Sequence, residues 1–219
     1  MRNALARIVT AAALVGSATF AQADFVNQGF ETGDLTGWGV FGDGSADVIS
    51  TTPNAASPGS LGSDNWGGSP GDSGSFMALL NNGSGIEVIN QAASPTSTPL
   101  FLWLNFITNE VPGTFNDFVT ATWTDTIGVH SASLSVNSDT SIMAGHDLRT
   151  SGWRSFLLDA GTSSLSVSVA NAGDTAVNSY SLVDITTVIP EPETYALMLA
   201  GLGLLGFLAR RRRNSLNIA

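Results

Sequence analysis

Strict alternation of serine with leucine or valine defines the segment SLSVSVA, residues 164–170. In an extended chain, successive side chains point to opposite faces, so Leu165, Val167 and Val169 would share one face and the serines the other. An amphipathic helix would instead repeat its apolar residues every three or four positions. The segment therefore predicts a β-strand with one face against a core and the other in water.

Nine further segments have the lengths and residue types of strands, and they are separated by clusters of Gly, Ser, Asn, Asp and Pro. Residues 100–108, LFLWLNFIT, are apolar on both faces as far as Leu104, which is typical of a central strand. Residues 51–74 are rich in Gly, Ser and Pro and predict a surface loop. We therefore expect an all-β fold, an antiparallel β-sandwich or jelly roll. The predicted strands are residues 38–41, 46–50, 75–80, 85–91, 100–108, 117–124, 130–136, 154–159, 164–170 and 179–188.

The first 23 residues have the three parts of a secretory signal. Arg2 and Arg7 precede an apolar run, and the run ends in small residues around Ala21-Gln22-Ala23. This order predicts a signal peptide over residues 1–23, export through the Sec machinery and removal by signal peptidase.

The charge of residues 24–189 limits the kinds of partner that this segment can bind. Residues 24–189 contain 16 Asp and Glu but only Arg149 and Arg154 as bases, so the formal charge is 2 − 16 = −14. Such a segment repels phosphate backbones, which excludes nucleic acid, whereas divalent cations remain plausible partners. The chain has no cysteine, so core burial must stabilise the domain without disulfides.

The C-terminal end has three parts in a fixed order. Pro190-Glu191-Pro192 precedes the apolar segment 194–209, which is followed by Arg210, Arg211, Arg212 and Arg213 and by a tail over residues 214–219. Residues 194–209 at about 1.5 Å per residue give a helix of about 24 Å, short for a hydrocarbon core of about 30 Å. The arginines would keep the end of this transmembrane helix in the cytoplasm.

This end resembles the PEP-CTERM sorting signal of bacterial envelope proteins. The resemblance implies an exosortase substrate that is anchored transiently in the inner membrane, cut near Pro190-Glu191-Pro192 and moved to the cell surface or extracellular matrix. A permanent single-pass anchor is the alternative. The predicted division is a signal peptide 1–23, a β-sandwich 24–189, a sorting signal 190–213 and a tail 214–219.

A second resemblance covers the start of the β-sandwich. Asn27-Gln28-Gly29-Phe30-Glu31-Thr32-Gly33 and Leu35-Thr36-Gly37-Trp38 are similar to the opening of carbohydrate-binding and galactose-binding-like jelly rolls. The resemblance implies a structural calcium ion held by Glu31 and Asp184, where the first and last strands meet. Calcium takes roughly six to eight oxygen ligands, so other groups would complete the shell. Otherwise Glu31 and Asp184 are ordinary surface or turn carboxylates.

Tryptophan provides the candidate glycan contacts. Trp38, Trp103, Trp123 and Trp153 lie in or beside apolar strand patterns and are expected in the core. Trp66 lies instead in a polar, glycine-rich stretch beside Asp64 and Asn65. An exposed indole flanked by a carboxylate and an amide could stack on a sugar and bind its hydroxyls. The alternative is that Trp66 plugs a loop against one edge of the sandwich.

We therefore expect an exported, non-enzymatic β-sandwich that serves as a structural or glycan-binding surface protein of the extracellular polysaccharide layer. We expect no catalytic residues. The alternative is a secreted hydrolase acting on polysaccharide, which would need a pair of carboxylates facing each other across a deep groove.

Overall fold

The computed structural model describes residues 25–50, 74–83, 85–113, 116–142, 148–173, 178–187 and 202. The chain divides into two compact units, Met1–Thr187 and Val188–Ala219. The described strands of the first unit form two sheets, and every strand pair in them is antiparallel. The predicted antiparallel β-sandwich is therefore confirmed.

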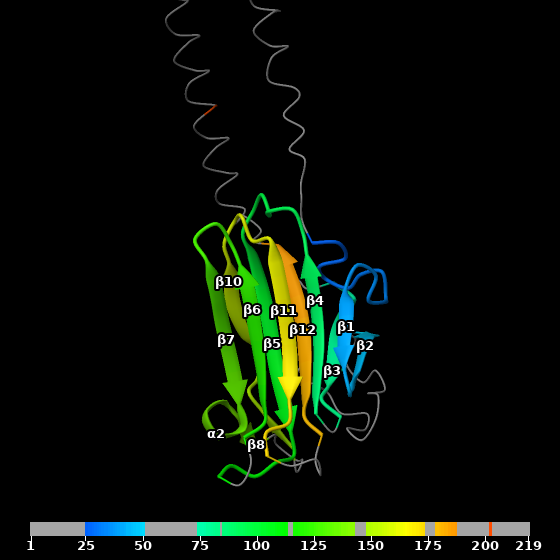
Figure 1. Ribbon diagram of the computed structural model, residues 1–219, viewed down its shortest axis with the longest axis vertical. Helices are drawn as coiled ribbons and strands as arrows, with labels where there is room; N and C mark the ends of the chain where they lie inside the picture. Colours follow the sequence, from blue (N-terminus) through cyan, green and yellow to red (C-terminus); the bar gives the residue numbers. More distant parts are fainter. Residues whose placement is uncertain are drawn as a thin grey trace, which may run out of the picture. The chain divides into compact units, whose positions relative to one another are not determined.

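The first sheet has five strands, which face the viewer in Figure 1. Because β11 lies at the centre and its serines alternate with Leu165, Val167 and Val169, one face of this sheet meets the core and the other meets water. In spatial order the strands are β1 (Gly39–Gly42), β4 (Ile86–Ala92), β11 (Ser164–Ala170), β6 (Phe118–Thr124) and β7 (Val129–Ser135).

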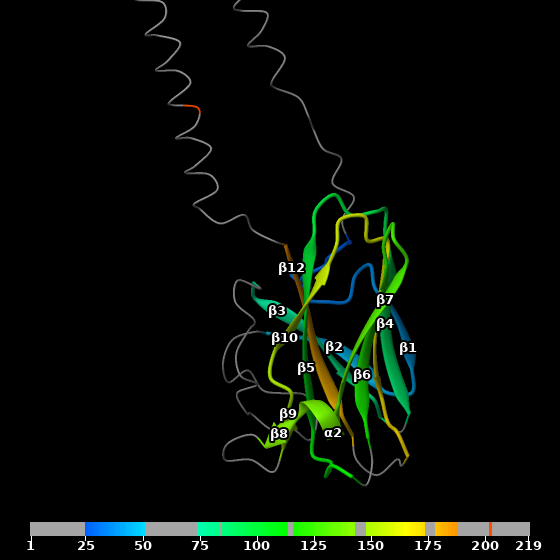
Figure 2. The ribbon, with the colours of Figure 1, turned by 90° about the vertical axis from the view of Figure 1, so that its left-hand side faces the viewer.

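The second sheet has seven strands and lies behind the first, as the edge-on view in Figure 2 shows. Strand β5 is central, with β12 on one side and both β10 and β9 on the other. The strands are β2 (Ser45–Ser50), β3 (Phe76–Asn81), β12 (Tyr180–Thr187), β5 (Leu100–Thr108), β9 (Arg149–Thr150), β8 (Ser141–Ile142) and β10 (Arg154–Leu158).

The main core fills the space between the sheets. Leu165, Val167 and Val169 of β11 pack there in one cluster with Leu102 and Leu104 of β5, all at most 1% exposed. Fully burying each such side chain contributes about 1.5–3 kcal/mol. This apolar layer holds the two sheets together without disulfides.

All ten predicted strands are present, and each end agrees with the prediction to within one residue. Among the elements of the described residues, only the two-residue strands β8 and β9 and the single turn of helix α2 (Val136–Asp139) were not predicted. A two-residue strand has no alternation to detect, and a single helical turn has no periodicity.

Two of the four tryptophans expected in the core lie elsewhere. Trp38 and Trp123 are core residues, at 7% and 8% exposure. Trp103 and Trp153 are half-buried. Trp103 alternates with Leu102 and Leu104, which face the core, so it points to the outer face of the seven-stranded sheet. Trp153 packs against a second, smaller apolar cluster that contains Met77 and Leu182.

Several predictions fall on residues outside the described ranges. These are the signal peptide 1–23, the loop 51–74 except for Gly74, and the sorting signal 190–213 except for Leu202. Within the described part of the chain, no helix is long and apolar enough to cross a membrane.

Candidate functional site

The outer face of the five-stranded sheet is covered by hydroxyl side chains. In each of its strands, alternate residues face the core, so the intervening residues point outward. Strand pairing aligns Asn90, Ser166, Thr122 and Ser131 in one row across β4, β11, β6 and β7. We call the outward Asn, Ser and Thr residues of these strands the hydroxyl face: Asn90, Thr120, Thr122, Thr124, Ser131, Ser133, Ser135, Ser164, Ser166 and Ser168.

The hydroxyl face has no charged side chain at any outward position of its described strands. The other outward residues of this sheet are glycine, alanine or larger apolar residues, such as Val88 beside Ser168 and Val129 beside Thr124. Some of the hydroxyls already pair with each other, since Thr120 Oγ1 and Ser133 Oγ lie 3.1 Å apart. A hydroxyl donates one hydrogen bond and can accept two, so capacity for a ligand remains.

A shallow groove of about 250 Å³ crosses this face. Small-molecule sites usually occupy about 300–1,000 Å³, so the groove fits part of a longer chain better than a whole small ligand. It is lined by Asn90, Gln91 and Ala92 of β4, by Ser164, Leu165 and Ser166 of β11, and by Thr122 of β6.

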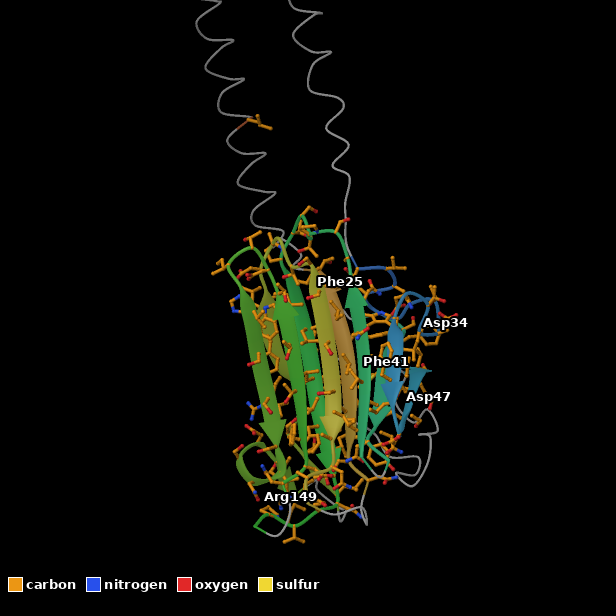
Figure 3. All side chains as sticks on the ribbon, viewed as in Figure 1. Phe25, Asp34, Phe41, Asp47 and Arg149 are labelled. Carbon is orange, nitrogen blue, oxygen red and sulfur yellow. The ribbon has the colours of Figure 1, made fainter. Side chains whose placement is uncertain are left out.

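An exposed aromatic ring lies at one end of the row that contains Asn90. Phe41 of β1 is 60% exposed, and Figure 3 shows it near the front of the sheet. Gly39 makes this arrangement possible, because a Cβ there would lie only 2.8 Å from both the Phe41 ring and Asn90 Oδ1. Since Gly39 has no side chain, the ring and the amide lie next to each other over its backbone. Phe41, Asn90 and the groove thus form one continuous surface.

The opening motif has a structural role. Phe30 is fully buried, and its ring centroid lies 5.3 Å from that of Trp38. The Trp38 indole N–H donates to the Asn27 carbonyl at 3.2 Å, and the Asn27 side-chain amide donates to the Asp34 carbonyl at 2.8 Å. These contacts close the segment into a compact loop whose Phe30 and Trp38 pack in the main core.

The two predicted calcium ligands both lie near Gly29. A Cβ at Gly29 would be 3.8 Å from both Asp184 Oδ1 and Glu31 Cγ, and 3.3 Å from the carbonyl oxygen of Ile185. Both side chains already accept backbone hydrogen bonds, Glu31 from Ser75 and Phe76 and Asp184 from Ile185. Two carboxylates and one carbonyl are fewer than the roughly six to eight oxygens that calcium takes. The described residues contain no group of three or more acidic or histidine side chains suited to a metal, so the calcium site stays a prediction.

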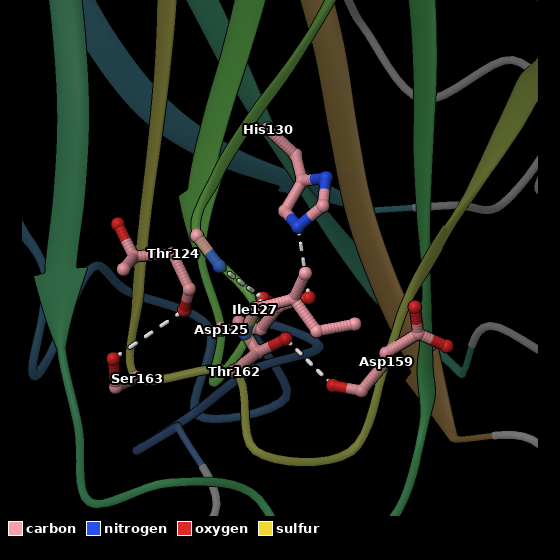
Figure 4. A network of polar contacts seen from close by, with 8 residues as sticks. Thr124, Asp125, Ile127, His130, Asp159, Thr162 and Ser163 are labelled. Carbon is pink, nitrogen blue, oxygen red and sulfur yellow. Dashed lines mark hydrogen bonds and ion pairs between the residues drawn. The ribbon is translucent and has the colours of Figure 1, made fainter.

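A polar network fixes the turn between β6 and β7 (Figure 4). Asp125 Oδ1 accepts the backbone N–H groups of Ile127 and Gly128, and Asp125 Oδ2 lies 3.0 Å from His130 Nε2. Burial opposes ionisation of Asp125, but the backbone hydrogen bonds and His130 outweigh it, so the pKa of Asp125 is lowered. The imidazole of His130 also stacks on Trp123.

The structure describes only some of the residues that the sequence predicted as site residues. Trp66, Asp64 and Asn65 lie outside the described residues, as do Pro190, Glu191 and Pro192 and the arginines 210–213. Phe41 and Asn90 were missed. Only a weak sequence pattern could have indicated this site. Phe41 follows Gly39 by two residues, in a strand that shows no clear alternation.

Comparisons with known proteins concern the C-terminal end and the sandwich separately. Residues 188–213 match the PEP-CTERM protein-sorting motif. No curated protein matches the chain.

Solved structures resemble the sandwich at low identity. A carbohydrate-binding module, TmCBM61, in complex with β-1,4-galactotriose is 14% identical, covers 78% of this chain and 100% of its own, and has a TM-score of 0.42. The non-crystalline cellulose-specific module CBM28 is 11% identical, covers 78% and 94%, and scores 0.38. A cleaved adhesin domain of Lys-gingipain from Porphyromonas gingivalis is 11% identical, covers 74% and 96%, and scores 0.42.

The fold and the C-terminal match together define a class: an exported protein with a β-sandwich that is sorted to the cell surface. More particularly, the chain carries a PEP-CTERM motif at residues 188–213, which implies processing by an exosortase.

Proposed function

We propose that this protein is a surface protein whose β-sandwich binds neutral extracellular polysaccharide on the hydroxyl face. The chain would be held transiently in the inner membrane by residues 194–209, cut near Pro190-Glu191-Pro192 and released to the surface or matrix. The observation that carries the binding proposal is the continuous surface of Phe41, Asn90 and the groove.

The chemistry of this surface suits a neutral sugar chain. Sugar hydroxyls both donate and accept hydrogen bonds, as do the Ser, Thr and Asn side chains of the hydroxyl face. The ring face of Phe41 can take the C–H groups of a sugar ring. An acidic polymer would be repelled by a segment of formal charge −14 over residues 24–189, so a neutral polymer is the better fit.

We further propose that the protein acts by binding and not by catalysis. A polysaccharide hydrolase needs two carboxylates facing a groove. The groove of the hydroxyl face is lined by amide, hydroxyl and apolar side chains. This lining supports a binding role over the hydrolase alternative.

Replacement of one exposed ring tests the proposal. In affinity electrophoresis against a panel of neutral and acidic polysaccharides, the wild-type protein should be retarded by at least one neutral polymer. Phe41→Ala should weaken that binding about fivefold or more, since an aromatic contact in a binding surface is often worth over about 1 kcal/mol. Leu157→Ala is the matched control, because Leu157 is also exposed, at 48%, but lies on the other sheet. Equal binding by both variants and the wild type would refute this site.

We retain calcium as a proposed structural ion between Glu31 and Asp184. An ion that binds only the folded state stabilises it by about 2.7 kcal/mol at a hundredfold excess over Kd. Thermal melts with calcium and with chelator should then differ by several degrees, and Glu31→Gln should remove most of that difference. Identical melts would rule the site out.

A further inference from the structure

One end of the sandwich carries the strand that leads into the sorting motif. Strand β12 ends at Thr187, which pairs with Leu100, the first residue of β5. The PEP-CTERM motif begins at the next residue, 188. Figures 1 and 2 both show the end of β12 and the turn between β6 and β7 at the same end of the sandwich. We call this the tail end, and it includes the β6–β7 turn 125–128 and the connections 93–99 and 159–163.

The three connections of the tail end contact one another. The Gly161 N–H donates to the carbonyl of Thr96 at 2.7 Å. A Cβ at Gly161 would lie only 2.8 Å from the side chain of Thr126, so the β6–β7 turn packs directly against this glycine. The tail end is therefore one continuous surface that draws on both sheets.

Large apolar side chains project into solvent at this end. Ile127, in the β6–β7 turn, is 82% exposed, and Val129, two residues later, is 71% exposed. On the other sheet, Leu157 lies one residue before the end of β10 and is 48% exposed. Water around such side chains is unfavourable, so they would gain free energy if an apolar medium came within reach.

Little negative charge faces outward at the tail end. The acidic residues of its three connections are Asp125 and Asp159. Asp125 is 8% exposed and pairs with His130, so Asp159 is the one exposed acid there. The formal charge of −14 over residues 24–189 opposes contact with an anionic surface. A surface that meets the tail end should therefore be apolar beneath uncharged polar groups.

The covalent chain brings such a surface to the tail end while the protein is anchored. Six residues, 188–193, separate Thr187 from the predicted transmembrane segment 194–209. A chain of this length extends at most about 25 Å. Because the arginines that follow the segment would stay in the cytoplasm, residue 194 would lie at the outer surface of the inner membrane. The bilayer surface is thus within a short tether of Thr187.

We propose that, in the anchored precursor, the tail end docks on the uncharged headgroups of the bilayer, with Ile127 and Val129 entering the interface. This proposal rests on the transient anchoring proposed above. A few apolar side chains bind a bilayer weakly by themselves, since even one myristoyl chain gives only marginal, reversible binding. The tether supplies the necessary effective concentration. Cleavage near Pro190-Glu191-Pro192 would therefore end the docking and release the sandwich.

Single fluorescent labels test the docking, because the chain has no native cysteine. The uncleaved full chain, recovered from an exporting cell without exosortase, is reconstituted in phosphatidylcholine vesicles. A label on Ser97→Cys, an exposed site of the tail end, should be quenched by lipids with a nitroxide on the headgroup. A label on Val111→Cys should not, since Val111 is 70% exposed but follows the opposite end of β5. A label on Leu202→Cys, in the predicted helix, should be quenched by a nitroxide deep in the acyl chains.

Two pairs of substitutions identify the side chains that make the contact. Ile127→Ser with Val129→Ser should remove most of the quenching at Ser97→Cys and should leave the melting temperature near that of the wild type, because both side chains are exposed. Val111→Ser with Ile142→Ser is the matched control, since both residues are 70% exposed, and should leave the quenching unchanged.

The outcomes separate the docking from the anchoring. Quenching at Leu202→Cys without quenching at Ser97→Cys would overturn the docking and leave the anchoring intact. Equal quenching at Ser97→Cys and Val111→Cys, or quenching that Ile127→Ser with Val129→Ser does not reduce, would also overturn the docking. An unquenched label at Leu202→Cys would overturn both proposals.

Discussion

At the scale of single residues, Glu87 shows how the interior holds an acidic group. It faces inward from β4, is 2% exposed, and accepts the Gly44 N–H at 3.1 Å. Burial raises its pKa because the charged form loses water, and Asp43 adds to this effect, while the Gly44 hydrogen bond opposes it.

The raised pKa of Glu87 gives a pH dependence of defined sign. A group whose pKa is raised on folding favours the folded state at low pH, and this contribution is lost as pH rises through the folded pKa. At about pH 7 the buried charge is therefore a cost. Glu87→Gln, which keeps an acceptor for Gly44, should be more stable than the wild type in urea melts at this pH. The difference should shrink below about pH 4; a constant difference would contradict the assignment.

At the scale of elements, the β6–β7 hairpin depends on Asp125. This one side chain accepts two backbone N–H groups of the turn and lies beside His130. The pKa of Asp125 is lowered, so its contribution is present above about pH 4 and lost as pH falls through the folded pKa. The turn also sets where β7 begins, at Val129.

Substitutions at Asp125 separate its two roles. Asp125→Ala removes the acceptor of two backbone N–H groups in the turn and should reduce the free energy of unfolding. Asp125→Asn keeps an acceptor oxygen and should cost clearly less, with the remaining loss due to the pairing with His130. Chemical denaturation of both variants at neutral pH provides the comparison. Equal losses would mean that the turn hydrogen bonds contribute little.

The strands could be predicted from the sequence because alternation is local. Residues 164–170 and 100–108 were predicted with the bounds that β11 and β5 have. The candidate site could not be predicted, because it depends on which strands become neighbours. Phe41 meets Asn90 only because β1 pairs with β4, and Asn90 meets Ser166 only because β4 pairs with β11. Strand order between distant segments is not contained in any local pattern.

At the scale of the whole molecule, the C-terminal motif and the sandwich have separate tasks. The motif at residues 188–213 directs the chain to the surface, and the proposed binding surface lies entirely within the first unit, Met1–Thr187. Removal of the tail would therefore leave the binding surface intact.

Processing gives a mass that can be measured directly. We expect the protein recovered from the cell surface to lack the predicted signal peptide 1–23 and to end near Glu193. A helix of about 24 Å is a poor permanent anchor in a hydrocarbon core of about 30 Å. Intact-mass spectrometry distinguishes the outcomes, since a surface form that retains Arg210 to Arg213 would support a permanent anchor instead.

The most direct test of the binding claim is a residue-by-residue map of the bound polysaccharide. Backbone amide shifts of the isotopically labelled protein should be followed by NMR while a neutral polymer is added. The polymer is one that retards the protein in affinity electrophoresis. We predict that the largest changes occur at Phe41, Asn90 and Ser166, with small changes on β12. Changes centred on Trp66, or none at all on the hydroxyl face, would contradict the account.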